Sequence, residues 1–217
     1  MQGGKGVNAE TVQRWLRAAA ALLHEQRDYL TQLDAAIGDA DHGTNMDRGF
    51  TAVLEKLEEL NGTTPPGRVL TTAGATLISK VGGASGPLWG TALRRAGRAL
   101  GDSEDFGPSE LVDALDAALV GVVELGAAEE GDKTMVDALA PALRALREGL
   151  DGGASLQDAL AAASSASEDG MKATVPMQAS KGRASYLGER SIGHQDPGAT
   201  STALIIAALA RAVDEET

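Results

Sequence analysis

Three acidic side chains stand close together early in the chain, and their spacing suggests a metal site. Asp34, Asp39 and Asp41 lie within eight residues, and Gly38 and Gly43 let the backbone fold the carboxylates inward. Carboxylates this close repel one another unless a cation lies among them, and an all-oxygen ligand set selects a hard ion. The spacing does not fit an EF-hand, so Mg²⁺ is favoured over Ca²⁺. A solvated acidic turn is the alternative.

A glycine-rich segment, GGASG at residues 82–86, stands directly before Pro87. Proline is common at the first position of a helix, so this segment is expected at a helix N-terminus. Free backbone N–H groups and the Ser85 hydroxyl could hold a phosphate there. The segment lacks the lysine of a P-loop and the spacing of a dinucleotide-binding motif. Taken alone, it is better explained as a flexible turn between helices.

A third segment, residues 181–198, combines cations with a second helix start. Lys181 and Arg183 supply positive charge for a phosphate, and Asp196 before Pro197 is a strong N-cap. Surface basic residues followed by an ordinary capped helix would give the same pattern. The segment therefore gains weight only if it lies beside the other two.

Helical periodicity dominates the rest of the chain. Aromatic residues make up only 3% of it, which leaves a sheet little of its preferred material. We predict an all-α fold, with residues 1–217 forming a single domain. Apolar residues at helical spacing predict eight helices, at residues 8–33, 46–60, 67–81, 87–101, 108–125, 135–150, 155–172 and 197–213.

Short links force consecutive helices to run antiparallel, so successive links alternate between the two ends of such a bundle. The links after the first, third, fifth and seventh helices hold nearly all the unusual residues. An up-and-down bundle gathers them at one end, which is the candidate site. A nucleotide bound with Mg²⁺ explains their content with one cause. These links span residues 34–45, 82–86, 126–134 and 174–196.

Composition excludes several classes of protein. A formal net charge of −12 repels a phosphate backbone, so we expect no nucleic-acid partner. The absence of cysteine excludes disulfides and thiolate chemistry, and is consistent with a reducing cytoplasm. The first ten residues have no apolar signal region, and the longest apolar run, residues 204–210, is too short to cross a membrane. We expect a cytoplasmic protein without a membrane partner.

At these motifs the chain resembles a known family, the L subunits of bacterial dihydroxyacetone kinases. The resemblance runs in order over nearly the whole chain from the first helix, and its last segment is long enough to be highly specific. In that family the fold is a barrel of eight antiparallel helices with the nucleotide at one end. The matching segments are residues 33–43, 82–87, 131–135 and 181–201.

The resemblance implies a site for ADP or ATP with Mg²⁺. Asp34, Asp39 and Asp41 would hold the metal, a pair of ions being expected, against the nucleotide phosphates. The family's nucleotide contacts fall on His42, Gly43, Thr44, Asn45, Ala84, Ser85, Gly126, Met135, Arg183, Asp196, Pro197 and Gly198.

Residue chemistry suggests individual roles. The planar, permanently charged guanidinium of Arg183 suits a phosphate clamp, and Met135 suits packing against the base. His42 is either a phosphate donor or a loop histidine satisfied within the protein. Trp89 and Tyr186 are expected to be packing residues. His24 is expected to be exposed, and no role is assigned to Lys181, Arg190 and His194.

The resemblance also implies a mechanism and partners. A separate K subunit of that family binds dihydroxyacetone covalently through its own histidine, so no catalytic residue is assigned here. Relatives that use ATP directly fuse K and L in one chain. A free-standing L subunit therefore implies the phosphotransferase-system type, in which ADP stays bound and a phosphohistidine subunit, M, rephosphorylates it. A homodimer is also compatible with the sequence.

Three alternatives stay open. The chain could serve an ATP-dependent kinase of dihydroxyacetone or a related ketose. It could be the nucleotide domain of an acyl kinase, which GDADHG at residues 38–43 disfavours. It could also be a non-catalytic regulatory module that binds nucleotide or lipid inside its helical bundle.

Overall fold

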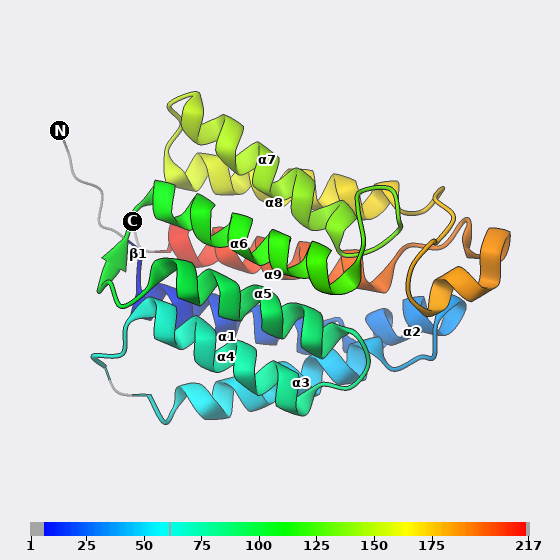
Figure 1. Ribbon diagram of the computed structural model, residues 1–217, viewed down its shortest axis with the longest axis horizontal. Helices are drawn as coiled ribbons and strands as arrows, with labels where there is room; N and C mark the ends of the chain where they lie inside the picture. Colours follow the sequence, from blue (N-terminus) through cyan, green and yellow to red (C-terminus); the bar gives the residue numbers. More distant parts are fainter. Residues whose placement is uncertain (1–6, 61, 216–217) are drawn as a thin grey trace.

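The computed structural model describes residues 7–60 and 62–215, and it is almost entirely helical (Figure 1). The all-α prediction is confirmed. The helices are α1 (Ala9–Glu25), α2 (Arg27–Ile37), α3 (His42–Leu57), α4 (Pro66–Lys80), α5 (Ser85–Leu100), α6 (Pro108–Gly126), α7 (Val136–Asp151), α8 (Leu156–Ala173), the 3₁₀-helix η1 (Arg183–Ser191) and α9 (Pro197–Asp214).

The long helices run up and down, so their links alternate between two ends (Figure 1). The links that follow α2, α4, α6 and α8 all lie at the right-hand end of the view, where η1 also lies. The antiparallel arrangement predicted from link lengths is therefore confirmed. No described helix has the length and apolar character needed to cross a bilayer.

A short strand pair, which the sequence did not predict, lies at the opposite end of the bundle (Figure 1). The two-residue strands β1 (Val7–Asn8) and β2 (Asp105–Phe106) pair antiparallel, with Val7 opposite Phe106. Both of these side chains are buried in the core. Asn8 then caps α1, because its side chain accepts a hydrogen bond from the Thr11 N–H at 3.1 Å.

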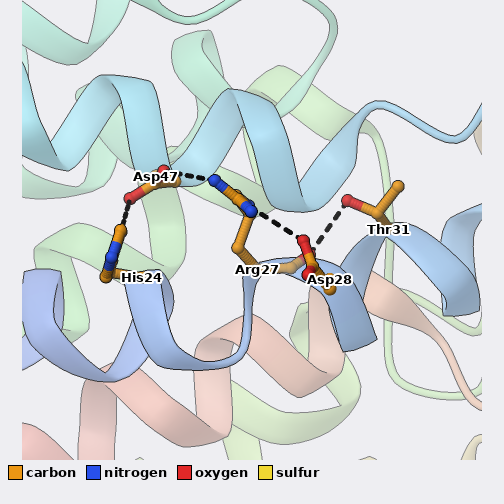
Figure 2. Close-up of polar contacts among 5 residues, drawn as sticks. All are labelled: His24, Arg27, Asp28, Thr31 and Asp47. Atoms are coloured by element: carbon orange, nitrogen blue, oxygen red, sulfur yellow. Dashed lines mark hydrogen bonds and ion pairs between the residues drawn. The ribbon is translucent and has the colours of Figure 1, made fainter.

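The first predicted helix, residues 8–33, is in fact two helices, so the count of eight is approximate. The chain turns at Gln26 between α1 and α2, and Asp47 of α3 bridges the break (Figure 2). Asp47 Oδ1 lies 2.9 Å from His24 Nδ1, and Asp47 Oδ2 lies 4.0 Å from Arg27 Nη1. His24 is exposed, as expected, but it is paired with a carboxylate.

Two further helix starts differ from the prediction in a way that matters for the site. Helix α3, which corresponds to the helix predicted at residues 46–60, begins at His42 instead of residue 46, because the carboxylate of Asp34 accepts hydrogen bonds from the backbone at its start. Helix α5 begins at Ser85, two residues before Pro87. Residues expected in loops therefore lie in the first turns of helices. Helix α3 ends at Leu57, three residues before the predicted end at Leu60. Asn61, which begins the predicted link, lies outside the described residues.

Helices α4 and α5 approach closely because glycines face each other across the contact. A Cβ atom at Gly74 would lie 2.5 Å from the Gly90 carbonyl oxygen, and one at Gly97 would lie 2.3 Å from the Gly67 carbonyl oxygen. The contact holds the link between α4 and α5 at the site end. Trp89 of α5 is buried, as predicted.

Candidate functional site

The four links at one end of the bundle enclose a cleft with about 1000 Å³ of space, part of it open to solvent. Helices α2, α3, α5, α6, α7 and α9 and the segment before α9 all contribute to its walls. The structure therefore brings most of the predicted site residues to one place. Those that line the cleft are Asp34, Asp39, Asp41, His42, Ser85, Gly126, Met135, Arg183, Asp196, Pro197 and Gly198.

The three acids converge at the mouth of the cleft. One carboxylate oxygen from each of Asp34, Asp39 and Asp41 lies within 4.8 Å of the others. Asp34 is buried, and its Oδ2 atom accepts hydrogen bonds from the backbone N–H groups of Asp41 at 2.8 Å and His42 at 3.0 Å. Gly38 leaves the necessary space, because a Cβ atom there would lie 2.0 Å from Asp34 Oδ1. This all-oxygen arrangement fits a hard cation such as Mg²⁺.

A cation from a distant segment faces this acidic group. The Nε atom of Arg183, at the start of η1, lies 2.9 Å from Asp39 Oδ2. Lys181 and Gly182 also line the cleft beside it. The site thus presents carboxylates for a metal and a guanidinium for an anion next to each other.

His42 is held by two hydroxyls from different helices. Its Nε2 atom lies 2.9 Å from Ser201 Oγ and its Nδ1 atom lies 3.0 Å from Ser85 Oγ. Burial lowers the pKa of His42 and so favours the neutral ring, although the charges of Asp34 and Asp41 act in the opposite direction. Ser201 Oγ donates to the Gly198 carbonyl at 3.0 Å, so it accepts from Nε2–H, while Ser85 donates to Nδ1.

This arrangement helps to decide between the two roles considered for His42, a phosphate donor or a histidine satisfied within the protein. Both ring nitrogens have partners inside the protein, so the side chain braces α3, α5 and α9 against one another. That favours the histidine satisfied within the protein over the free phosphate donor. Its predicted contact with nucleotide stays a prediction.

Four predicted nucleotide contacts do not line the cleft. Gly43 faces α2, where a Cβ atom would lie 2.0 Å from the Arg27 carbonyl oxygen. Asn45 is buried and its Oδ1 atom accepts a hydrogen bond from Arg48 Nη2 at 2.8 Å. Thr44 and Ala84 are exposed at the starts of α3 and α5. These assignments also remain predictions.

The inner wall of the cleft is apolar. Trp89 and Met135 are both buried there, which suits a flat aromatic ligand group better than a charged one. The remaining apolar lining comes from Ile37, Leu88, Val122, Ala128 and Val136. By contrast, the sequence-based expectation for Tyr186 is wrong: it lies on η1, outside the bundle, and is 86% exposed.

Asp196 caps α9 at the floor of the cleft, as predicted. Its Oδ2 atom accepts a hydrogen bond from the Ala199 N–H at 2.6 Å. Burial raises the pKa of Asp196 to about 7, and the hydrogen bond and the charge of Lys133 oppose that rise. The carboxyl group therefore titrates near neutral pH.

Two residues that organise the site were missed by sequence reasoning. Asp137 is buried and holds the α6–α7 link, because its carboxylate accepts from the N–H groups of Gly131 at 2.6 Å and Thr134 at 2.7 Å. Lys133 is also buried, and its ammonium donates hydrogen bonds to the backbone carbonyls of Thr174 and His194. Lys133 lies in segment 131–135, which carries part of the family resemblance, but no role is assigned to it. Asp137 lies outside the matching segments and looks like an ordinary acid near a helix start.

Comparison with known proteins places this fold and cleft in a family. Residues 36–211 match the DAK2 domain. The chain is 47% identical over 201 residues to "PEP-dependent dihydroxyacetone kinase, ADP-binding subunit DhaL" of Escherichia coli K12, covering 93% of this chain and 95% of that protein. It is 41% identical over 196 residues to the corresponding subunit of dihydroxyacetone kinase 1 of Listeria innocua, covering 90% and 92%.

A solved structure agrees with these relatives. The crystal structure of the dihydroxyacetone kinase from C. freundii in complex with AMP-PNP and Mg²⁺ matches with a TM-score of 0.71 and 27% sequence identity. The match covers 95% of this chain and 34% of that one, so this chain spans about a third of the larger enzyme. The fold is that of a DAK2 domain. The chain belongs to the DAK2 family and, within it, to the ADP-binding DhaL subunits of dihydroxyacetone kinase.

Proposed function

We propose that this chain is the nucleotide-binding subunit of a phosphotransferase-system dihydroxyacetone kinase and acts in the cytoplasm. The observation that carries the proposal is the convergence of Asp34, Asp39 and Asp41 beside Arg183 at the mouth of an apolar-backed cleft. The similarity to the ADP-binding subunits along nearly their whole length supports the same conclusion.

The acids divide the work of holding a metal. Asp34 is fixed by its two backbone hydrogen bonds, while Asp39 and Asp41 complete the ligand set from the α2–α3 link. They would hold one or two Mg²⁺ ions, which neutralise phosphate charge during in-line phosphoryl transfer. Without the carboxylates, the site could not bind the metal that accompanies a nucleoside diphosphate.

The cationic side of the cleft would bind the phosphates. Arg183 offers a planar fork of donors, and the helix starts at Ser85 and Pro197 both line the cleft, where their N-terminal dipoles favour an anion. The base would lie against Trp89 and Met135, which are apolar and fixed by burial. The nucleotide would thus be oriented with its phosphates at the cationic side of the cleft and its base at the apolar side.

The partner subunits must reach the same end of the bundle. Phosphoryl transfer brings the terminal phosphate within about van der Waals contact of the acceptor, so the sugar-bearing K subunit has to dock over the cleft mouth. The phosphohistidine subunit M must approach the same phosphate to recharge ADP. This chain then contributes binding and positioning, and the group that activates the sugar belongs to K.

Reconstitution tests the proposal. The purified chain is mixed with K, M and dihydroxyacetone, and dihydroxyacetone phosphate is measured with either phosphorylated M or ATP as the phosphate source. We expect sustained product formation only with phosphorylated M, and release of about one ADP per chain when the purified protein is denatured.

The alternatives give different results. Sustained turnover with ATP at a rate independent of M would indicate the ATP-dependent type. No product from either source, with nucleotide still bound, would indicate a regulatory module. Sedimentation of the free chain would decide whether it also forms a homodimer.

A further inference from the structure

Lys133 carries a buried charge in the link between α6 and α7. Its side chain is only 1% exposed. The Nζ atom donates hydrogen bonds to three backbone carbonyls: Thr174 at 2.6 Å, Met177 at 3.2 Å, and His194. A neutral amine has two hydrogens and an ammonium has three, so this set of acceptors requires the charged form. Burial lowers the pKa of Lys133, and the nearby charges of Asp196 and Asp137 oppose that change.

The three carbonyls belong to both ends of one segment. Thr174 and Met177 follow the end of α8, whereas His194 stands directly before the start of α9. One ammonium therefore closes the segment 174–194 on itself. A neighbouring contact supports the same attachment, because the Ser180 N–H donates to the Asp132 carbonyl at 3.2 Å. We call this arrangement the lysine clasp, made by Lys133 with the carbonyls of Thr174, Met177 and His194.

The clasp holds the cationic part of the cleft. The closed segment carries Lys181 and Arg183, which line the cleft, and it leads directly into Asp196 at the start of α9. Segment 174–196 has no long helix. Besides the clasp, its two ends are joined by the Gly193 N–H, which donates to the Val175 carbonyl at 2.8 Å, and the Asp196 N–H, which donates to Thr174 Oγ1 at 3.0 Å. If the ammonium were removed, the three carbonyls would lose its hydrogen bonds, although the Thr174 carbonyl would keep a backbone donor, the Met177 N–H at 3.2 Å. Asp196 would also lose a nearby positive charge.

We propose that Lys133 is a positioning residue for nucleotide binding, which holds the Arg183 segment and the start of α9 in their binding geometry through the lysine clasp. All three of its donors are used by carbonyls, so it acts through the segment and not through a contact with phosphate. The inference rests on the proposed function for its link to nucleotide. The attachment of segment 174–194 by Lys133 does not depend on the proposed function.

Lys133→Met tests the clasp, with Lys56→Met, an exposed lysine of α3 that pairs with Glu59, as the matched control. Hydrogen exchange of segment 174–196 is measured without nucleotide, and the affinity for Mg²⁺–ADP is measured by calorimetry. We expect exchange at least about tenfold faster and affinity about 10- to 100-fold weaker in Lys133→Met, with helical circular dichroism unchanged. Exchange and affinity both within twofold of the wild type would overturn the proposal.

A chemical rescue separates charge from packing. The chain has no cysteine, so Lys133→Cys carries a single thiol that can be alkylated in denaturant before refolding. The thiolate displaces bromide from 2-bromoethylamine, forming a C–S bond and a side chain that ends in ammonium. 1-Bromopropane gives a neutral side chain of the same length by the same displacement. Wild-type protein taken through denaturation and refolding is the control.

The two products make opposite predictions. The ammonium product should bind Mg²⁺–ADP within about threefold of the wild type, and the propyl product should resemble Lys133→Met. Equal affinity of the two products would contradict the clasp, even if Lys133→Met itself fails to fold. If the wild type does not bind Mg²⁺–ADP, the proposed function fails, and the exchange rates of the two alkylated proteins then decide the clasp alone.

Discussion

The guanidinium of Arg183 lies 2.9 Å from the carboxylate of Asp39 and thereby joins the η1 segment to the acidic link between α2 and α3. Both side chains are well exposed, at 68% and 38%, so the pair adds little to the free energy of unfolding. Its consequence is positional, because it places a guanidinium beside three carboxylates. A nucleoside diphosphate bound to a metal ion has charges complementary to these: the phosphates are negative and the metal is positive.

Replacing Asp39 by Asn should weaken Mg²⁺–ADP binding by at least about tenfold, because the metal loses one of three carboxylates. The unfolding free energy should change by less than about 1 kcal/mol, since the exposed pair with Arg183 is weak and repulsion among the acids is relieved. Calorimetry and urea unfolding measure the two quantities. Asp102→Asn, an acid at the opposite end that pairs with Arg68 at 3.7 Å, is the control. Unchanged affinity in Asp39→Asn would exclude the metal assignment.

Asp196 should give the stability of the protein a distinct dependence on pH. Its pKa is raised by burial to about 7 in the folded state, against 3.8 as the ordinary value. Between these values the folded chain holds a proton that the unfolded chain lacks, so this site makes the protein less stable as pH rises from 4 to 7.

Asp196→Asn removes that contribution and keeps an oxygen to accept from Ala199. Urea unfolding at pH 5 and pH 8 should therefore show a smaller loss of stability with rising pH in the variant than in the wild type. The lowered pKa of His42 acts in the opposite direction, but it is present in both proteins and cancels in the comparison. The same pH dependence in both would show that Asp196 does not titrate in this range.

Gly74→Ala should destabilise the protein by about 1–3 kcal/mol, although alanine is the better helix former. The added Cβ would lie 2.5 Å from the Gly90 carbonyl oxygen and 2.9 Å from the Arg94 backbone nitrogen, so α4 and α5 would have to move apart. Gly62→Ala is the control, since among the described residues, chain neighbours aside, no atom lies within 4 Å of its Cβ position. A stability gain in Gly74→Ala, measured by urea unfolding, would show that the close approach is not required.

Charge reversal should affect turnover differently at the two ends of the bundle. Arg190 is exposed on η1 at the cleft end, and Glu104 is exposed just before β2 at the other end. We expect Arg190→Glu to lower turnover with the K subunit by at least about tenfold and Glu104→Lys to leave it within twofold. ADP binding is measured in parallel, so that a loss of nucleotide is not mistaken for a loss of docking. Equal losses of turnover, with ADP binding intact in both variants, would show that the cleft end is not the docking face.

The gathering of the four links could be predicted from the sequence, because link lengths and helical periodicity depend on neighbouring residues alone. The cap at Asp196 was predictable for the same reason. The break at Gln26 was not, since the apolar spacing continues through it and Asp47 bridges it from another helix. Lys133 was missed because its partners stand 41 to 61 residues away in the chain. Contacts of that kind are set by tertiary packing.

Tyr186 shows the opposite error. Its aromatic side chain was expected to be a packing residue. The segment around it has no apolar periodicity and forms η1 outside the long helices, so nothing covers the ring. Helix-based reasoning has no information about a segment that lies beyond the bundle.

If the proposed function is correct, this chain carries ADP at the cleft and receives a phosphoryl group there. The most direct test mixes the chain, loaded with Mg²⁺–ADP, with phosphorylated M subunit in the absence of K, and measures ATP after acid quenching. We expect about one ATP per chain, and almost none from Asp39→Asn, because its metal site would be incomplete. If a wild-type chain that demonstrably holds ADP yields no ATP, the proposed function is wrong.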